Sequence, residues 1–109
     1  MKLEIMGSEW TVEYRKPSED KYLAENDGYC DHSVRLIVVV SEREGSELND
    51  FKAYQKRCLR HEIIHAFMYE SGLAHDWEHR SYGQEETVVD WIAIQFPKIY
   101  KVFKEAKAI

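Results

Sequence analysis

Apolar and polar side chains alternate in the first part of the chain, which predicts β-strands. The alternation covers residues 2–6 and again 9–15, with a Gly-Ser pair between the two runs. Two alternating runs around a short glycine-containing turn are typical of a β-hairpin. The polar stretch 17–28 predicts a loop with room for one helical turn at 19–24. Residues 34–40 are nearly all apolar and rich in β-branched types. They predict a buried strand, either central in a sheet or on one side of a small sheet beneath a helix.

The second half of the chain follows a helical period instead. Apolar positions recur at spacings of three, four or seven over residues 47–71, and Gly72 follows where a C-terminal capping glycine is expected. A second helix is predicted at about 84–96, ending before Pro97. The segment 98–109 places its apolar residues on one side and its lysines on the other, which predicts a short amphipathic helix.

Together these elements predict an α+β fold. We expect a small antiparallel or mixed three-stranded sheet packed on the long helix, followed by the second helix and the short C-terminal helix. The 109 residues are enough for a single domain, 1–109, with one modest core.

Charge and cysteine content exclude several classes of function. The net charge of -5 gives no indication of a nucleic-acid partner. The longest apolar run, 36–40, is too short to span a bilayer, and the first residues form no apolar signal segment. We therefore expect a cytoplasmic protein without a membrane partner. Cys30 and Cys58 fit neither a C-x-x-C site nor a disulfide framework, so we expect two reduced, partly buried thiols.

The strongest chemical signal is a His-Glu-x-x-His sequence inside the long predicted helix. His61 and His65 are four residues apart, so they project from one helix face and can ligate one zinc ion. Glu62 lies between them, close enough to act as a base on a water at the metal. On a wheel at about 100° per residue, apolar residues fall on the far side: Leu59, Ile63 and Phe67. The alternative is a helix with two surface histidines and a solvated glutamate, but histidines among so much apolar surface usually need a partner.

Two histidines leave a zinc site incomplete, because a catalytic zinc normally has three protein ligands and one open position. The metzincin pattern would place a glycine at Met68 and a histidine at Ser71, so that family is excluded. The remaining candidates for the third ligand lie further along the chain: His75, His79, Glu85 and Glu86.

Glu86 is the preferred third ligand, followed by Glu85 and then His79. Glu86 opens the second predicted helix, and Asp90 shares its face one turn later. Asp90 would accept the N–H of a ligating imidazole and so select its tautomer. The alternative is that Glu85 and Glu86 are ordinary first-turn residues near the positive end of the helix. Asp90 argues against this, because a carboxylate among apolar neighbours is costly unless it is paired.

The motif His61-Glu62-x-x-His65, followed by Glu86 and Asp90, resembles the gluzincin arrangement of the thermolysin-type metallopeptidases. In that family the third ligand is a glutamate on a following helix, with an aspartate one turn later. The size of the chain and its order of elements resemble the minigluzincins, which implies a zincin-like domain.

The resemblance covers roughly the C-terminal half of the chain. Residues 60–73 and 89–93 also resemble small phage and prophage proteins that are assigned to the metallopeptidases by sequence. Gln84 and Glu85 depart from the asparagine that usually precedes the ligand glutamate. We also expect the domain to lack the C-terminal subdomain that supplies substrate-binding and oxyanion-stabilising side chains in larger relatives.

The resemblance implies a zinc-dependent metalloendopeptidase. His61, His65 and Glu86 would hold Zn²⁺, and Glu62 would be the general base. The substrate would be a protein or peptide bound in extended form along a sheet edge, supplied by the strand at 34–40 or by its neighbour.

Two questions stay open at the level of sequence. A developing oxyanion needs a donor besides zinc, and none is assigned among the residues of the connection between the helices: His75, His79 and Tyr82. The alternative function is a non-catalytic, zinc-stabilised interaction module of the kind that a phage or prophage could encode.

Overall fold

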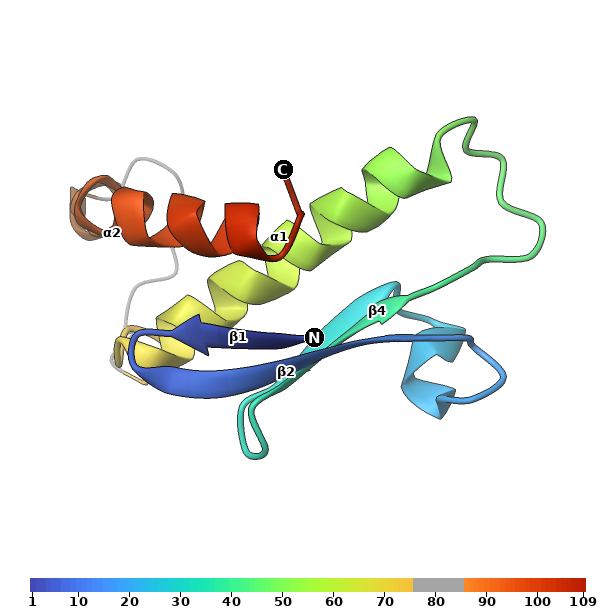
Figure 1. Ribbon diagram of the computed structural model, residues 1–109, viewed down its shortest axis with the longest axis horizontal. Helices are drawn as coiled ribbons and strands as arrows, with labels where there is room; N and C mark the ends of the chain where they lie inside the picture. The colour runs from blue at the N-terminus through green and yellow to red at the C-terminus, as the bar shows by residue number, and fades with distance from the viewer. Residues whose placement is uncertain (76–85) are drawn as a thin grey trace.

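The structure contains a four-stranded mixed sheet with two helices on one of its faces (Figure 1). This computed structural model describes residues 1–75 and 86–109, and in the second range it leaves out the side chains at 86, 87, 89, 90 and 93. The α+β class predicted from the sequence is confirmed. The described residues contradict the prediction of three strands and of a separate C-terminal helix.

The strands follow the spatial order β1-β2-β4-β3. Their bounds are β1 Lys2–Ile5, β2 Ser8–Arg15, β3 Gly28–Asp31 and β4 Leu36–Val40. β1 pairs with β2 and β3 pairs with β4, both antiparallel, and a parallel pairing of β2 with β4 joins the two hairpins. β3 therefore forms one edge of the sheet. It is the strand that the sequence did not predict, because its four half-buried residues carry no hydrophobic alternation.

The first hairpin is confirmed, and its turn explains why. Met6 and Gly7 have φ angles of 51° and 88°, and a type I′ turn requires positive φ at both central residues. Arg35 also has a positive φ, of 51°, which does not belong to an extended strand. β4 therefore begins at Leu36, two residues after the start of the predicted strand 34–40. Val34, before it, is 66% exposed.

β4 is buried on both faces, as its apolar run predicted. Ile37 and Val39 belong to the main core beneath the helices. Val38 and Val40 point the other way and pack with Leu23 in a smaller cluster. Leu23 comes from η1, a 3₁₀-helix at Lys21–Ala24, which lies within the predicted helical turn. The central strand β4 is therefore shielded from water on both of its faces.

The long helix α1 spans Phe51–Glu70 and packs on β3 and β4. It begins four residues later than predicted, where the Asp50 side chain accepts a hydrogen bond from the Ala53 N–H. Its last residue is Glu70, Ser71 is the C-cap, and Gly72 follows with a φ of 83°, the positive value expected of the predicted capping glycine. Its fully buried residues face the sheet: Leu59, Ile63, Ala66 and Phe67.

A carboxylate at the end of α1 ties the helix to the sheet. Glu70 accepts hydrogen bonds from the Trp10 indole at 2.9 Å, from Ser8 at 3.1 Å and from Arg35 at 2.7 Å. Trp10 is also 1% exposed and belongs to the main core. These contacts fix the rotation of α1, and with it the face that the helix turns toward β3.

The second helix, α2, spans Glu86–Glu105 without a break and contains Pro97. A proline in a helix lacks the N–H that would bond to the carbonyl four residues earlier, which is why a break was predicted. The break does not occur because core contacts hold the following turns, with Ile99, Val102 and Ala106 buried against β1 and α1. Within the described ranges, no helix is long and apolar enough to cross a membrane.

Candidate metal centre

His61 and His65 approach each other closely on α1. Their Nε2 atoms are 3.1 Å apart and their ring centroids 4.8 Å apart. Both side chains are exposed, whereas Ile63 between them is fully buried. The helical spacing thus divides the segment as predicted, with the imidazoles on the accessible side and the apolar residues against the sheet.

Glu62 adds a carboxylate to the histidine pair. One ligand atom from each of His61, Glu62 and His65 lies within 4.8 Å of the others, and this group could hold a metal ion. Among the described residues it is the one group of this kind. Imidazole nitrogens and a carboxylate oxygen are the ligand types that divalent transition metals prefer.

The carboxylate and the two imidazoles differ in their exposure to water. Glu62 is 7% exposed, and burial raises the pKa of its carboxyl group to about 7. Desolvation, and after it the charge of the neighbouring His61, lowers the pKa of His65. A neutral imidazole is the form that binds a metal. Near neutral pH the site therefore offers a ligand-competent histidine and a carboxyl group that can take up or release a proton.

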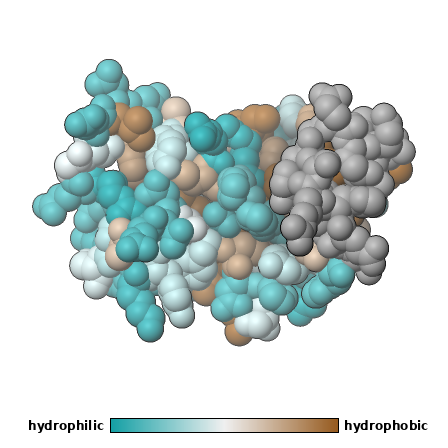
Figure 2. All heavy atoms as spheres, turned by 180° about the vertical axis from the view of Figure 1, so that it is seen from behind, coloured by the Kyte–Doolittle hydropathy of each residue, from teal (hydrophilic) through white to brown (hydrophobic). Residues whose placement is uncertain are grey.

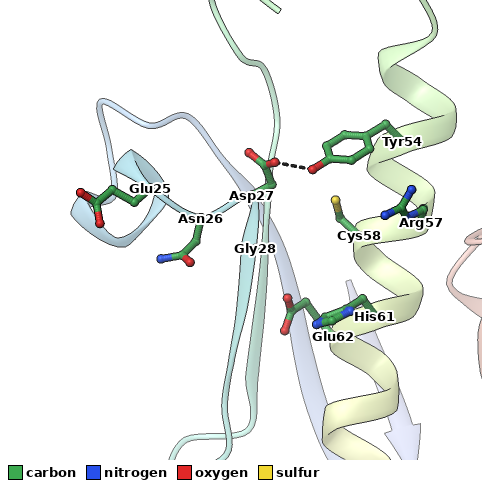
Figure 3. Close-up of a pocket in the computed structure, with 9 residues that line it drawn as sticks. All are labelled: Glu25, Asn26, Asp27, Gly28, Tyr54, Arg57, Cys58, His61 and Glu62. Carbon is green, nitrogen blue, oxygen red and sulfur yellow. Dashed lines mark hydrogen bonds between the residues drawn. The ribbon is translucent and has the colours of Figure 1, made fainter. Parts of the chain in front are cut away.

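The edge strand β3 forms the opposite wall of the site. A cavity of about 280 Å³ lies between α1 and β3, and it is lined by Gly28, Tyr29, Cys30, His61, Glu62, His65 and Tyr69. The Glu62 carboxylate points from α1 toward Gly28 at the start of β3 (Figure 3). The site is therefore a groove between a helix and the edge strand of the sheet.

The residues of β3 were not predicted to belong to the site, because β3 itself was not predicted as a strand. Tyr69 was also not predicted as a site residue, although its spacing in the sequence could have indicated it. It follows His65 by four residues and therefore shares its helix face. Its ring stacks on His32, with centroids 4.1 Å apart, and both rings lie edge-on to His75.

A second cavity, of about 300 Å³, adjoins the site on the side toward the start of α1 (Figure 3). Gly28, His61 and Glu62 line both cavities. The second cavity continues between α1 and the chain just before β3, past Cys58 as far as Tyr54. The groove thus extends beyond the histidine pair in this direction.

The two cysteines are free and half-buried, as predicted. Burial, and after it the charge of Glu62, raises the pKa of the Cys30 thiol to about 12. Burial also raises the pKa of Cys58. Both side chains are therefore protonated thiols at neutral pH, and they differ in this from the thiolates that bind metals.

The structure describes the backbone of the preferred third ligand, Glu86, but not its side chain. It describes α2 from Glu86 onward. The side chains of Glu86 and Asp90 lie outside the described residues, as do the whole of Glu85, His79 and Tyr82. The prediction that Glu86 completes the site and that Asp90 orients an imidazole therefore stays a prediction.

His75 is the candidate that the structure does place. It is exposed and belongs to the ring cluster with His32 and Tyr69. It is not a member of the group formed by His61, Glu62 and His65.

One contact relates α2 to the site. The Trp91 indole donates a hydrogen bond to the Ser71 hydroxyl at 3.2 Å, so the first turns of α2 lie against the end of α1. Trp91 also packs on the main core. Comparisons with protein-family models, with curated proteins and with solved structures find no match to this chain.

Proposed function

We propose that the protein is a zinc-dependent metalloendopeptidase that hydrolyses peptide bonds, with Glu62 as its general base. The observation that carries this proposal is the convergence of two imidazoles and a nearly buried carboxylate within 4.8 Å, in a groove beside a sheet edge. Two nitrogen ligands from one helix turn and a neighbouring carboxylate suit zinc by their donor chemistry.

We propose His61, His65 and Glu86 as the residues that hold the metal. The described part of the chain contributes the histidine pair, and Glu86 is supported by its place in α2, whose Trp91 is hydrogen-bonded to Ser71 at the end of α1. When bound, zinc would polarise the scissile carbonyl and lower the pKa of a water molecule.

Glu62 moves the proton in the proposed reaction. Its carboxylate would accept a proton from the attacking water and later deliver it to the leaving amine. The surroundings favour both transfers, since burial brings the pKa of the carboxyl group to about 7. A structural metal site has no need of such a base beside it.

β3 would bind the substrate. It is an edge strand, so the hydrogen-bonding groups on its outer side are not used by the sheet. An extended peptide that pairs with this edge would pass directly over His61 and His65, because β3 and α1 are the two walls of one groove. Of the two strands that the sequence offered for this edge, the one at 34–40 and its neighbour, the first is the central strand β4 and the neighbour β3 lies at the edge.

The test is the substitution Glu62→Gln, which keeps the shape of the side chain and removes its basicity. We expect the zinc-loaded variant to retain the metal and to lose hydrolysis of an unfolded protein substrate. Glu4→Gln, at an exposed position on β1, is the matched control and should remain active. Equal inactivity of the wild type and Glu62→Gln on a broad peptide library, with zinc bound to both, would instead favour a zinc-stabilised interaction module.

A further inference from the structure

The cavity beside the histidine pair is closed at its far end. The Tyr54 hydroxyl donates a hydrogen bond to Asp27, and this contact crosses from α1 to the residue just before β3 (Figure 3). Asp27 is held in place from the other side by Arg43, at 2.5 Å. A peptide lying in the groove therefore meets a fixed crossing at Tyr54 and Asp27.

The length of groove before this crossing is short. Tyr54 precedes His61 by seven residues, and a helix rises 1.5 Å per residue, so the two are about 10 Å apart along α1. An extended peptide covers about 3.3–3.6 Å per residue. A bound chain thus has room for about three residues beyond the histidine pair before it must end or leave the groove.

The direction of the chain follows from the strand. β3 runs alongside α1, with Gly28 beside His61 and Glu62 and with Tyr29 and Cys30 further along the groove. Antiparallel pairing is the slightly more stable mode of strand addition. A substrate paired antiparallel to β3 would enter the closed cavity with the part of its chain that is C-terminal to the cleaved bond.

One of the residues that line the closed cavity is a cation, Arg57, which has no ionic partner in the part of the chain that the structure describes. Among the described residues, Arg57 takes part in no ion pair or hydrogen bond. Its guanidinium lies over the Tyr54 ring, 5.9 Å from the centroid. Three carboxylates also line this cavity: Asp27 is paired with Arg43, Glu25 stands on the far wall, and Glu62, the proposed base, lies beside His61 (Figure 3). Arg57 is therefore available to a ligand.

We propose that this cavity binds a carboxylate of the substrate, held by Arg57, within about three residues after the cleaved bond. This inference rests on the proposed peptidase function and names its substrate class. Guanidinium groups bind carboxylates with paired, charge-assisted hydrogen bonds. The carboxylate is the C-terminus of a peptide or the side chain of an acidic residue, because both present the same group to Arg57.

The test uses four versions of one seven-residue fluorescent peptide that has no other acid. The C-terminus is free or amidated, and an interior position carries Glu or Gln, so the two sources of a carboxylate are separated. Zinc-loaded wild type is assayed for kcat/KM and for the cut position by mass spectrometry. Binding is measured by fluorescence anisotropy with the Glu62→Gln protein, so that cleavage does not interfere.

We expect peptides with a carboxylate to be bound and cut about tenfold or more better than their neutral counterparts. The cut should fall within about three residues before that group. Arg57→Gln should abolish the preference and Arg57→Lys should retain part of it. Lys56→Gln is the matched control, since Lys56 is an exposed cation on another part of α1, and it should change nothing.

The outcomes separate this inference from the proposed function. Hydrolysis without a carboxylate preference, or with a preference that survives Arg57→Gln, overturns the inference and leaves the peptidase intact. Binding that depends on Arg57, with no hydrolysis of any peptide by wild type, supports the carboxylate site and overturns the peptidase.

Discussion

Gly28 and Glu62 lie so close together that no larger residue fits at position 28 without a shift. A Cβ added to Gly28 would be 3.3 Å from both Cγ and Oε1 of Glu62, and 3.0 Å from the carbonyl oxygen of Val38. Glycine, which has no Cβ, therefore leaves room for the Glu62 carboxylate beside the edge strand. The position of the Glu62 carboxylate depends on that space.

Gly28→Ala should displace Glu62 and weaken the sheet edge. Overpacking of a filled site typically costs about 1–3 kcal/mol, and we expect an unfolding free energy lower by about that amount, together with slower peptide hydrolysis. The measurement is chemical denaturation combined with a kinetic assay. A double-mutant cycle with Glu62→Ala should show that the second substitution relieves part of the cost. Strictly additive effects would mean that the two side chains do not compete for space.

Glu86→Ala should weaken zinc binding much more than Glu85→Ala. Loss of residues that only orient a metal ligand costs about 10–100-fold in affinity, so loss of a ligand should exceed about 100-fold. Competition with a chromophoric chelator measures the affinity of each variant. The opposite order would move the third ligand by one residue, and equal small effects would remove this segment from the site.

Removal of the metal should destabilise the wild type but not variants that lack a histidine of the pair. A ligand present at 100 times its Kd stabilises the folded state by about 2.7 kcal/mol, so zinc at that excess should raise Tm and chelator should lower it again. His61→Ala and His65→Ala should lose this response. His75→Ala is the matched control, because His75 is an exposed histidine outside the group. A wild type that binds no zinc and is fully stable would contradict the metal centre.

The Asp27–Tyr54 contact should contribute to stability at neutral pH and lose that contribution in acid. The Tyr54 hydrogen bond, opposed by burial and aided by Arg43, holds the pKa of Asp27 below its ordinary value. A lowered folded-state pKa stabilises above the unfolded value of about 4, and the gain disappears as the pH falls through the folded value.

Tyr54→Phe should therefore lower the unfolding free energy by about 1 kcal/mol at pH 7, and the difference should shrink below about pH 4. Urea denaturation across this pH range measures it. Tyr14→Phe is the control, since the Tyr14 hydroxyl makes no hydrogen bond within the described residues. A Tyr54→Phe difference that does not change with pH would show that Asp27 is not the group responsible.

Helical spacing explains how much of the site could be predicted. His61 and His65 are separated by one turn, so any α-helix through this segment brings their rings together, and the buried Leu59, Ile63 and Phe67 make that helix necessary. The first hairpin and the doubly buried β4 were predictable for the same reason, because alternation and continuous apolar character are properties of local sequence.

Contacts between distant segments could not be predicted in this way. β3 has no pattern of its own and is a strand because it pairs with β4, and only that pairing places Gly28 opposite Glu62. The crossing of Tyr54 with Asp27 joins residues 27 positions apart. The unbroken α2 likewise depends on core contacts that outweigh the effect of Pro97.

The amino-acid sequence by itself determined the chemistry available to this protein, two imidazoles and a carboxylate on one turn of a helix, because their spacing is a local property of the chain. The tertiary structure decided what stands opposite them: the edge strand of the sheet, a glycine that makes room for the carboxylate, and a cavity whose arginine forms no ion pair with the other described residues. Those features arise from packing between segments that are far apart in the chain, and no local pattern encodes such packing.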